Sequence, residues 1–526
     1  MYSSLKKHKY AFCVAVIILF HGINNYLWLK QDNESMGTDV AIHINSAVSL
    51  RQGLGEIAFS RVSLAQKGKQ FAGLFFSGQS YWPKFVPFFA ALASYLPPDP
   101  LFWIRFSNMF YFAILIISVY LLGKKAHSPQ AGVLAAVFIS LYPGIFGLSR
   151  KFGLDFPLIG ITALAMYLLF SSDNFQNRRY SILFGITSGL GMLIKGQLLL
   201  FLIGPFLYTA GNGFMNRESR KKSLVNISVM LGIALAIALS WWYRMHSGLW
   251  GVYLRYNIPV ALQYFLVTAY HQMSPLFFTA FLMGIAFYLV RRKLPPLFLL
   301  LWLVTPCLLL LAFYTSNHER YIFPAFAALA LISVTGILEM PSRKARLALF
   351  LFFIFFGLVN FFNSSYTAEF SSSSWITHRP QQHNHRKVMD IFSREVKRHG
   401  AVNSNIGMIE EDYFRGDPCI RLGYFLKLIN PQSKVFLSAD GYIILYPYEA
   451  GFRASEGFLA NLNNFDFLLV FSQNPLKPSF WNAQKPSGNA ERDVLLEAQK
   501  AFRDFKIIKR GVLRPEEIYV FLLKRQ

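Results

Sequence analysis

The chain has 526 residues, of which 54% are hydrophobic and 17% aromatic, and its mean hydropathy is +0.35. This balance excludes an ordinary soluble globular protein, because apolar residues at such a frequency need a bilayer as their solvent. The formal net charge is +25, yet the Lys and Arg residues lie mainly in short loops between apolar runs, so this charge does not indicate a nucleic-acid partner.

The chain begins with a basic segment that contains Lys6, Lys7 and Lys9, and an apolar run follows over residues 10–29. A signal peptide would start in the same way, but this run is long and no small-residue cleavage pattern follows it. We therefore expect an uncleaved first span whose N-terminus faces the cytoplasm.

Further apolar runs of spanning length predict a polytopic α-helical membrane protein with about eleven transmembrane helices. The runs after the first lie at residues 102–122, 130–148, 154–171, 180–195, 197–211, 223–242, 274–291, 295–313, 321–338 and 345–362. Lys and Arg collect in every second loop, and by the positive-inside rule these loops are cytoplasmic. The substantial outer segments are then about 31–101, about 243–273, and everything after about 363.

The first outer segment contains an apolar stretch at 81–96 that prolines bracket on both sides. Its apolar core, Phe85–Leu96, is too short to span a bilayer. Counting it as a span would also turn every later Lys and Arg cluster to the outside, so we expect a helix that lies in the interface.

The sequence changes character after the last span, where a Ser-rich stretch leads into mixed charged and apolar residues. We therefore divide the chain into a transmembrane module, residues 1–363, and a soluble domain on the outer face, residues 364–526. An amphipathic pattern at Arg386–His399 and several β-rich runs predict an α/β fold for this domain. The β-rich runs are Ser433–Leu437, Tyr442–Tyr446, Phe465–Phe471 and Ile518–Leu523.

Two aspartates lie near the predicted outer ends of spans, where an ionisable side chain is a candidate for function. Asp39 opens a helical pattern beyond the first span, with His43 one turn later. Asp155 lies at the entrance of a later span, two residues before Pro157. Helix capping is the alternative for both aspartates, since Asp is favoured at helix N-termini.

Cationic residues lie at two other predicted outer turns. Lys195 interrupts two apolar runs, and Arg320 follows His318 before a helix that contains Pro324. The alternatives here are a lysine that extends its amine to the interface and an ordinary solvated loop. Taken singly, neither turn defines a function.

Taken in order, these outer-face elements resemble the GT-C glycosyltransferases, close to the branch of the protein O-mannosyltransferases and the lipid A aminoarabinose transferase. The matching pieces, within about residues 1–340, are Asp39 with His43, Tyr81-Trp82-Pro83, Arg105, Ser149-Arg150 with Asp155, Gly189–Gly196 with Lys195, and Arg320–Ala325. The chain departs from the family at Asp39-Val40, where Asp-Glu is frequent, and at Pro83-Lys84, where two prolines are frequent.

The resemblance implies transfer of a sugar from a polyprenyl-phosphate carrier to an acceptor hydroxyl or phosphate at the outer face, with inversion at the anomeric carbon. Asp39 would act as general base, because the attacking hydroxyl must lose a proton, and Asp155 would be a second carboxylate that orients the acceptor. Cationic groups would stabilise the negative charge that grows on the leaving phosphate. The substrate-binding candidates are His43, Glu56, Arg150, Lys195, His318 and Arg320.

A divalent cation, Mg or Mn, is an optional cofactor in this interpretation, and Asp39 and Asp155 would then be its ligands. A zinc site or a disulfide framework is not predicted. The three cysteines, Cys13, Cys307 and Cys419, lie far apart and lack CxxC or Cys/His spacing.

The alternative function is that of a transporter or flippase of lipid-linked saccharides. Such a protein should have polar or broken helices near the bilayer midplane and related halves, whereas the charges here concentrate at one face and no repeat is evident. The expected partners are a polyprenyl-phosphate-linked sugar, a lipid, glycan or protein acceptor, and membrane lipids. The resemblance implies a bacterial inner membrane, with the C-terminal domain in the periplasm.

Overall fold

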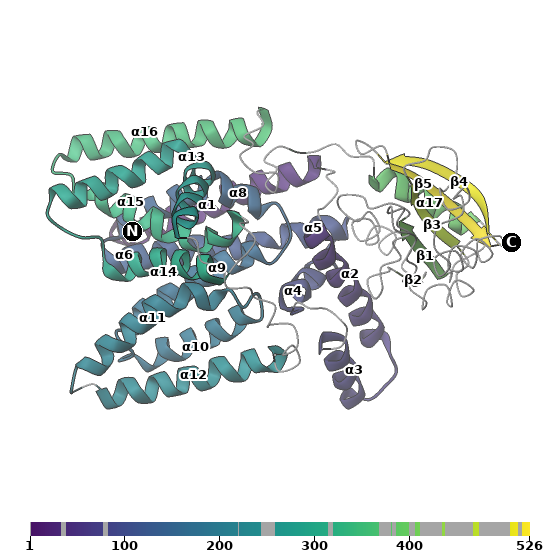
Figure 1. The fold of residues 1–526 in the computed structure, drawn as a ribbon, viewed down its shortest axis with the longest axis horizontal. Helices are drawn as coiled ribbons and strands as arrows, with labels where there is room; N and C mark the ends of the chain where they lie inside the picture. Colours follow the sequence, from purple (N-terminus) through teal and green to yellow (C-terminus); the bar gives the residue numbers. More distant parts are fainter. Residues whose placement is uncertain are drawn as a thin grey trace. The chain divides into compact units, whose positions relative to one another are not determined.

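The computed structural model describes residues 2–32, 38–76, 83–218, 220–242, 258–313, 319–367, 380, 385–398, 405–410, 434–436, 467–472, 505–513 and 518–525. The chain divides into two compact units, and each is described by itself (Figure 1). Unit 1 comprises Met1–Lys30, Ser80–Ala90 and Phe102–Pro380, and unit 2 comprises Gln31–Gln79, Ala91–Leu101 and Gln381–Gln526.

Helices make up most of the described chain. In chain order they are α1 (Tyr2–Gln31), α2 (Thr38–Phe59), α3 (Leu64–Phe76), α4 (Phe85–Ala93), α5 (Pro100–Phe106), α6 (Asn108–Ala126), α7 (Pro129–Ser140), α8 (Pro143–Ser149), α9 (Asp155–Ser171), α10 (Arg178–Met192), α11 (Leu198–Met215), α12 (Arg220–Trp242), α13 (Ile258–Val290), α14 (Leu297–Phe313), the 3-10 helix η2 (Glu319–Ala325), α15 (Phe326–Leu338), α16 (Arg343–Phe362), the π-helix η3 (Asn363–Thr367) and α17 (His385–Arg398).

Seven helical segments in the described part of the chain are long and apolar enough to cross a membrane, so the protein is an integral membrane protein. They are Lys9–Gln31, Pro100–Ala126, Leu198–Met215, Arg220–Ser240, Phe265–Val290, Glu319–Leu338 and Arg343–Thr367. The pair α7 and α8 passes the same test jointly but is bent by 69° at the junction. The expected run at 130–148 is therefore a broken helix.

Three other expected spans are short helices. α9 has 17 residues, α10 has 15 and α14 has 17, whereas about 20 are needed to cross the hydrocarbon core. Helix length therefore does not establish the expected eleven crossings, which stay a prediction. The apolar core at 85–96 forms α4, which has only 9 residues and is too short to span.

The outer segment expected at 243–273 is partly helical. Helix α13 already begins at Ile258 and continues to Val290, with a break at Ser274. The apolar run predicted to start at residue 274 is thus the second half of a longer, broken helix. Because Ser-Pro at 274–275 favours a helix start, the sequence pattern concealed the first half.

Helix α15 is central to unit 1. Every side chain from Phe326 to Ile337 is buried, and the helix packs against α7, α13 and α14. A Cβ atom built on Gly336 would lie only 2.6 Å from the Cα of Gly284 on α13. Glycines at this crossing therefore allow direct backbone contact, as small residues do in other membrane helix pairs.

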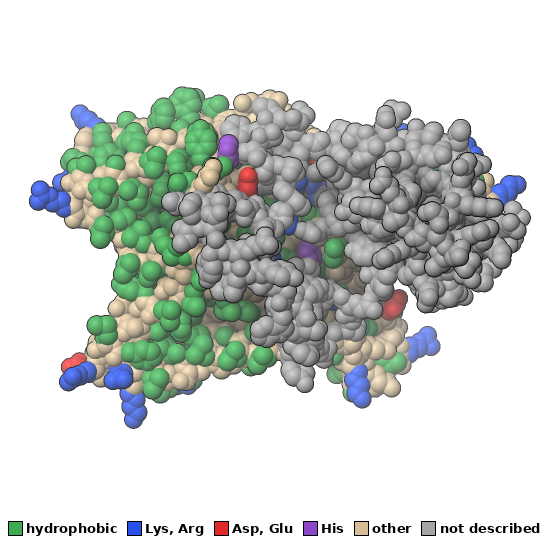
Figure 2. Space-filling view, viewed as in Figure 1, with side chains coloured by type: hydrophobic (Ala, Val, Ile, Leu, Met, Phe, Trp, Pro, Cys, Tyr) green, Lys and Arg blue, Asp and Glu red, His purple; other side chains and the backbone are tan. Residues whose placement is uncertain are grey.

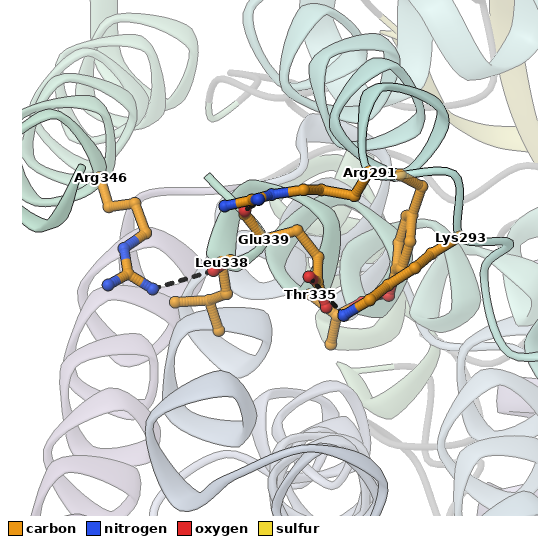
Figure 3. A network of polar contacts seen from close by, with 7 residues as sticks. Arg291, Lys293, Thr335, Leu338, Glu339 and Arg346 are labelled. Carbon is orange, nitrogen blue, oxygen red and sulfur yellow. Dashed lines mark hydrogen bonds and ion pairs between the residues drawn. The ribbon is translucent and has the colours of Figure 1, made fainter. Parts of the chain in front are cut away.

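A polar network lies at the C-terminal end of α15. Lys293 pairs with Glu339 at 2.8 Å, and Arg291 Nε donates to the Glu339 carbonyl oxygen at 3.0 Å (Figure 3). Arg346 Nη1 donates to the carbonyl oxygen of Leu338 at 2.9 Å. These cations belong to loops expected in the cytoplasm, and they are favourable here because a helix C-terminus carries partial negative charge.

Hydrophobic side chains cover the visible flanks of unit 1, and Lys and Arg side chains gather at one end of it, on the left in Figure 2. Large apolar side chains exposed on its helices include Phe12, Leu19, Leu235, Leu289 and Phe355. An extended apolar surface is unfavourable in water but is suited to contact with lipid.

Unit 2 contains a five-stranded mixed sheet with the strand order β2-β1-β3-β5-β4. The strands are β1 (Asn405–Glu410), β2 (Lys434–Phe436), β3 (Phe467–Ser472), β4 (Phe505–Leu513) and β5 (Ile518–Arg525). β1 pairs in parallel with β2 and β3, whereas β5 is antiparallel to β3 and β4. Helix α17 packs against β4 and buries its apolar face, which includes Val388, Met389, Phe392 and Val396.

The amphipathic helix predicted at Arg386–His399 is confirmed as α17. Three predicted β-rich runs form β2, β3 and β5, and the fourth, Tyr442–Tyr446, lies outside the described residues. The strands β1 and β4 were not predicted. The division at residues 363 and 364 stays a prediction, as does the placement of the C-terminal part on the outer face.

We expect Gly336→Ala to lower the thermal midpoint of unfolding in detergent, because the added methyl group would meet the Gly284 backbone and force α13 and α15 apart. Overpacking of this kind costs about 1–3 kcal/mol. Gly232→Ala on α12 is the matched control, since nothing lies within 4 Å of a Cβ atom there. Equal midpoints for the two variants in a thermal denaturation scan would contradict the close crossing.

Candidate active site

Three of the residues predicted from the sequence meet in unit 1. Lys195 Nζ lies 2.7 Å from Asp155 Oδ1, and Arg320 Nε lies 3.3 Å from Asp155 Oδ2. The side chains of Lys195, Asp155 and Arg320 are only 9%, 15% and 12% exposed. One carboxylate faces two cations here, and cations of this kind suit an anionic ligand.

Asp155 is the first residue of α9, where the partial positive charge of a helix N-terminus favours a carboxylate. Pro157 follows within the first turn, where its missing N–H leaves no helical hydrogen bond unmade. Leu154 occupies the N-cap position. The Asp155 carboxylate faces Lys195 and Arg320, so capping alone does not account for it.

Lys195 lies in the turn between α10 and α11, with its backbone N–H bonded to the Gly191 carbonyl oxygen at 3.0 Å. Its Nζ also lies 4.5 Å from the centroid of the Tyr321 ring. A Cβ atom on Gly191 would lie 2.9 Å from Ile161 of α9, so glycine permits this close approach of α10 to α9. The lysine is buried and ion-paired, and it does not extend its amine to the interface.

Arg320 lies on η2, which packs against α9, α13 and α14. The preceding residue, Glu319, accepts a hydrogen bond from Gln272 Nε2 on α13. A solvated loop was the alternative interpretation of this segment, but its two charged residues, Glu319 and Arg320, are partly buried and contact other helices. Two adjacent residues of η2 thus face different helices: Arg320 faces Asp155 of α9, and Glu319 faces Gln272 of α13.

Arg150, predicted to bind substrate, is fully buried at the C-terminal end of α8. Its Nε donates to Asn25 Oδ1 at 3.1 Å, and its Nη2 donates to Ser365 Oγ at 2.9 Å. The guanidinium also lies 5.1 Å from the Trp28 ring. These contacts tie α8 to α1 and to the π-helix η3, which favours a structural role over substrate binding.

Four predicted residues remain, and the structure describes the side chains of two of them. Asp39 lies in the first turn of α2, but its side chain is outside the described residues, as is His318. On α2, His43 is buried and Glu56 is exposed. These residues of α2 belong to unit 2, whereas Asp155 belongs to unit 1.

Four further polar residues of unit 1 were not predicted to have a role. Gln272 and Glu319 form the hydrogen bond described above, and a glutamine inside an apolar run was the available signal. Burial lowers the pKa of Lys84, because desolvation disfavours its charged form. Gln197, next to the Lys195 turn, is buried with neither amide atom hydrogen-bonded to a described residue.

The residues around Asp155 do not fit a divalent cation. Both carboxylate oxygens already face protein cations, and the described residues hold no group of three His, Cys, Asp or Glu side chains that could bind a metal. A hard cation needs several oxygen ligands. Metal binding by Asp39 stays a prediction, because its side chain is outside the described residues.

Residues 82–242 match the model of a family described as dolichyl-phosphate-mannose-protein mannosyltransferase. The matched part contains both Asp155 and Lys195. No curated protein matches the chain in sequence.

The structure is similar to that of ArnT from Cupriavidus metallidurans in the apo state, with a TM-score of 0.57, 10% identity and 97% of each chain covered. The same protein bound to undecaprenyl phosphate gives a TM-score of 0.57 and 11% identity, again with 97% of each chain covered. The structure is also similar to that of the archaeal oligosaccharyltransferase AglB from Archaeoglobus fulgidus in complex with an inhibitory peptide and a dolichol-phosphate. This match has a TM-score of 0.53 and 12% identity, and it covers 98% of this chain and 74% of that chain. The resemblance to the GT-C glycosyltransferases predicted from the sequence is thus confirmed at the level of the fold.

We expect Asp155→Asn to be destabilising, because it removes the carboxylate that two largely buried cations face. Removing one partner of a buried ion pair costs about 3–5 kcal/mol. The double variant Asp155→Asn with Lys195→Met should recover part of this loss, since it also removes one of the two cations that faced Asp155. Strictly additive losses, measured by thermal unfolding, would contradict a coupled cluster.

We expect Arg150→Lys to lower the thermal midpoint, because a lysine amine does not reproduce the two directed bonds to Asn25 and Ser365. Hydrogen bonds from a charged group contribute about 1.5–3 kcal/mol each. Arg343→Lys, at an exposed position, is the control and should leave the midpoint unchanged. An Arg150→Lys protein as stable as this control would argue against the structural role.

Proposed function

We propose that this protein is a membrane glycosyltransferase that moves a sugar from a polyprenyl-phosphate carrier to an acceptor hydroxyl or phosphate. The observation that carries the proposal is the buried cluster in which Asp155 faces the two cations Lys195 and Arg320, in a fold of the GT-C type. Support comes from the mannosyltransferase family model over residues 82–242 and from the similarity to an ArnT structure that holds undecaprenyl phosphate.

The chemistry needs positive charge where the bond breaks. As the sugar leaves the carrier, negative charge grows on the phosphate oxygens, and cations already fixed at that place stabilise the transition state. Arg320 offers a planar set of donors and Lys195 a compact charge, and both suit a phosphate. Asp155 holds the two cations at a fixed spacing, so its main task in this proposal is to orient them and, through them, the substrates.

A base is still required for the acceptor hydroxyl. Both oxygens of the Asp155 carboxylate already face cations, so in this proposal they are occupied in orienting Lys195 and Arg320. We assign the base to Asp39, in the first turn of α2. A single displacement in which the base activates the acceptor and no covalent intermediate forms would invert the anomeric centre.

Charge placement supports a reaction at the outer face of the membrane, and the resemblance to bacterial members of the family supports a bacterial inner membrane. The cations Arg291, Lys293 and Arg346 gather at the C-terminal end of α15. Arg320 lies on η2, which directly precedes the N-terminal end of that helix. If the first group is cytoplasmic, as the positive-inside rule requires, the ion cluster lies toward the periplasm. Because α16 is one further crossing, the part of the chain after residue 363 would then be periplasmic, and the basic N-terminal segment is assigned to the cytoplasm by the same rule.

A transporter or flippase of lipid-linked saccharides is the second candidate. The bend of 69° between α7 and α8 and the break of α13 at Ser274 favour it, because transporters use discontinuous helices at their substrate sites. A flippase moves its lipid without breaking the bond between sugar and phosphate. Detection of sugar transfer therefore separates the two candidates.

We expect the purified protein in nanodiscs to transfer sugar from one member of a panel of radiolabelled polyprenyl-phosphate sugars. Asp39→Asn should reduce turnover by about 10²–10⁴-fold with donor binding retained, as removal of a general base does. Asp155→Asn should weaken donor binding as well as turnover, because the cations lose their fixed spacing.

Wild-type turnover in both variants would exclude this site. If the wild type transfers no sugar from any donor but moves fluorescent lipid-linked saccharides across proteoliposome membranes, the flippase is the correct function. Circular dichroism and size-exclusion profiles of each variant show whether a loss of turnover results from a loss of fold.

A further inference from the structure

Helix α13 is broken at Ser274, close to the ion cluster, and the backbone conformation at the break is unfavourable. Ser274 has φ 71° and ψ 153°, which are values that residues other than glycine rarely adopt. It is buried, its hydroxyl has no hydrogen-bond partner among the described residues, and Pro275 follows. Strained backbone of this kind persists where surrounding packing fixes it, and it is frequent at functional sites.

The break comes two residues after Gln272, whose side chain is held tightly. A Cβ atom on Gly144 of α8 would lie 3.1 Å from both Cβ and Oε1 of Gln272 and 2.9 Å from Cζ of Phe323. A side chain at position 144 would therefore crowd both Gln272 and Phe323. The buried Gln272 then donates its amide hydrogen to Glu319 Oε2 on η2.

Glu319 differs from Asp155 in its partners. Asp155 faces two cations, whereas Glu319 receives a hydrogen bond from a neutral amide and pairs with no described lysine or arginine, and its ionisable neighbour is His271. A carboxylate has two oxygens that accept several hydrogen bonds, so one held by a single amide keeps capacity for further donors. Glu319 is half-buried, so a bound ligand can reach it.

We propose that Glu319, positioned by Gln272, binds hydroxyl groups of the sugar that is transferred, while Lys195 and Arg320 bind the carrier phosphate. The inference rests on the proposed function and deepens it, because it names the residue that recognises the sugar. Glu319 and Arg320 are consecutive in η2, about 3.8 Å apart along the backbone. The sugar and the phosphate of the donor are also joined directly, so adjacent residues suit adjacent groups.

The test compares the binding of two probes to the full-length protein in nanodiscs. The first is bare undecaprenyl phosphate, and the second is the undecaprenyl-phosphate sugar with the highest turnover in the transfer assay. Glu319→Gln should lower the affinity for the sugar-bearing probe by about 10- to 100-fold, which corresponds to the loss of a hydrogen bond to a charged group. The affinity for bare undecaprenyl phosphate should not change. Glu339→Gln, at the other end of α15, is the matched control and should bind both probes as the wild type does.

Gln272→Leu tests the positioning role and covers the case in which Glu319→Gln fails to fold. It should show the same selective loss, and the double variant should be no worse than either single variant, because both changes remove one interaction. Additive losses would overturn the positioning role of Gln272. If Glu319→Gln lowers the affinity for both probes equally, or for neither of them, the sugar-binding role is wrong. A wild-type protein that binds neither probe would overturn the proposed function itself.

Discussion

The ion cluster of Asp155 with Lys195 and Arg320 is the constraint around which unit 1 is arranged. Three charges that are 9–15% exposed are tolerable only if they compensate one another, and they come from the start of α9, the turn after α10 and the 3-10 helix η2. The start of α9, the turn after α10 and η2 must therefore lie next to one another. Helix α9 has 17 residues, about 25 Å of helix, which is shorter than the hydrocarbon core of about 30 Å. A short helix allows its charged end to lie below the membrane surface, where surrounding helices exclude water and strengthen each electrostatic contact.

The two ends of α15 show how the same types of charge serve different purposes. At one end Lys293 and Arg291 neutralise Glu339 and the end of the helix, in an exposed network that anchors a loop. At the other end η2 brings Arg320 to Asp155 and Glu319 to Gln272. The first carboxylate of the site orients cations, and the second keeps its capacity to accept hydrogen bonds from a ligand. In the proposed reaction, this division of roles would give separate places for the phosphate and the sugar of a lipid-linked donor.

The sequence predicted Asp155, Lys195 and Arg320 as site residues because charges at the ends of apolar runs are costly and therefore informative. The same reasoning could not assign Arg150, since its partners Asn25 and Ser365 lie far along the chain and only folding brings them together. Glu319 and Gln272 were missed for a related reason: the break at Ser274 looks like the start of a helix in sequence, so Gln272 was placed in an outer loop. The strands β1 and β4 were also missed, because short apolar runs among charged residues do not separate strand from helix by periodicity.

A structure of the protein with undecaprenyl phosphate in nanodiscs, determined by electron cryomicroscopy, tests the central claim most directly. Our account predicts that the phosphate lies within hydrogen-bond distance of Lys195 Nζ and the Arg320 guanidinium, with Asp155 still between the two cations. A phosphate bound elsewhere in unit 1, with the ion cluster closed and without contact to the lipid, would contradict the account and leave Asp155, Lys195 and Arg320 with a purely structural role.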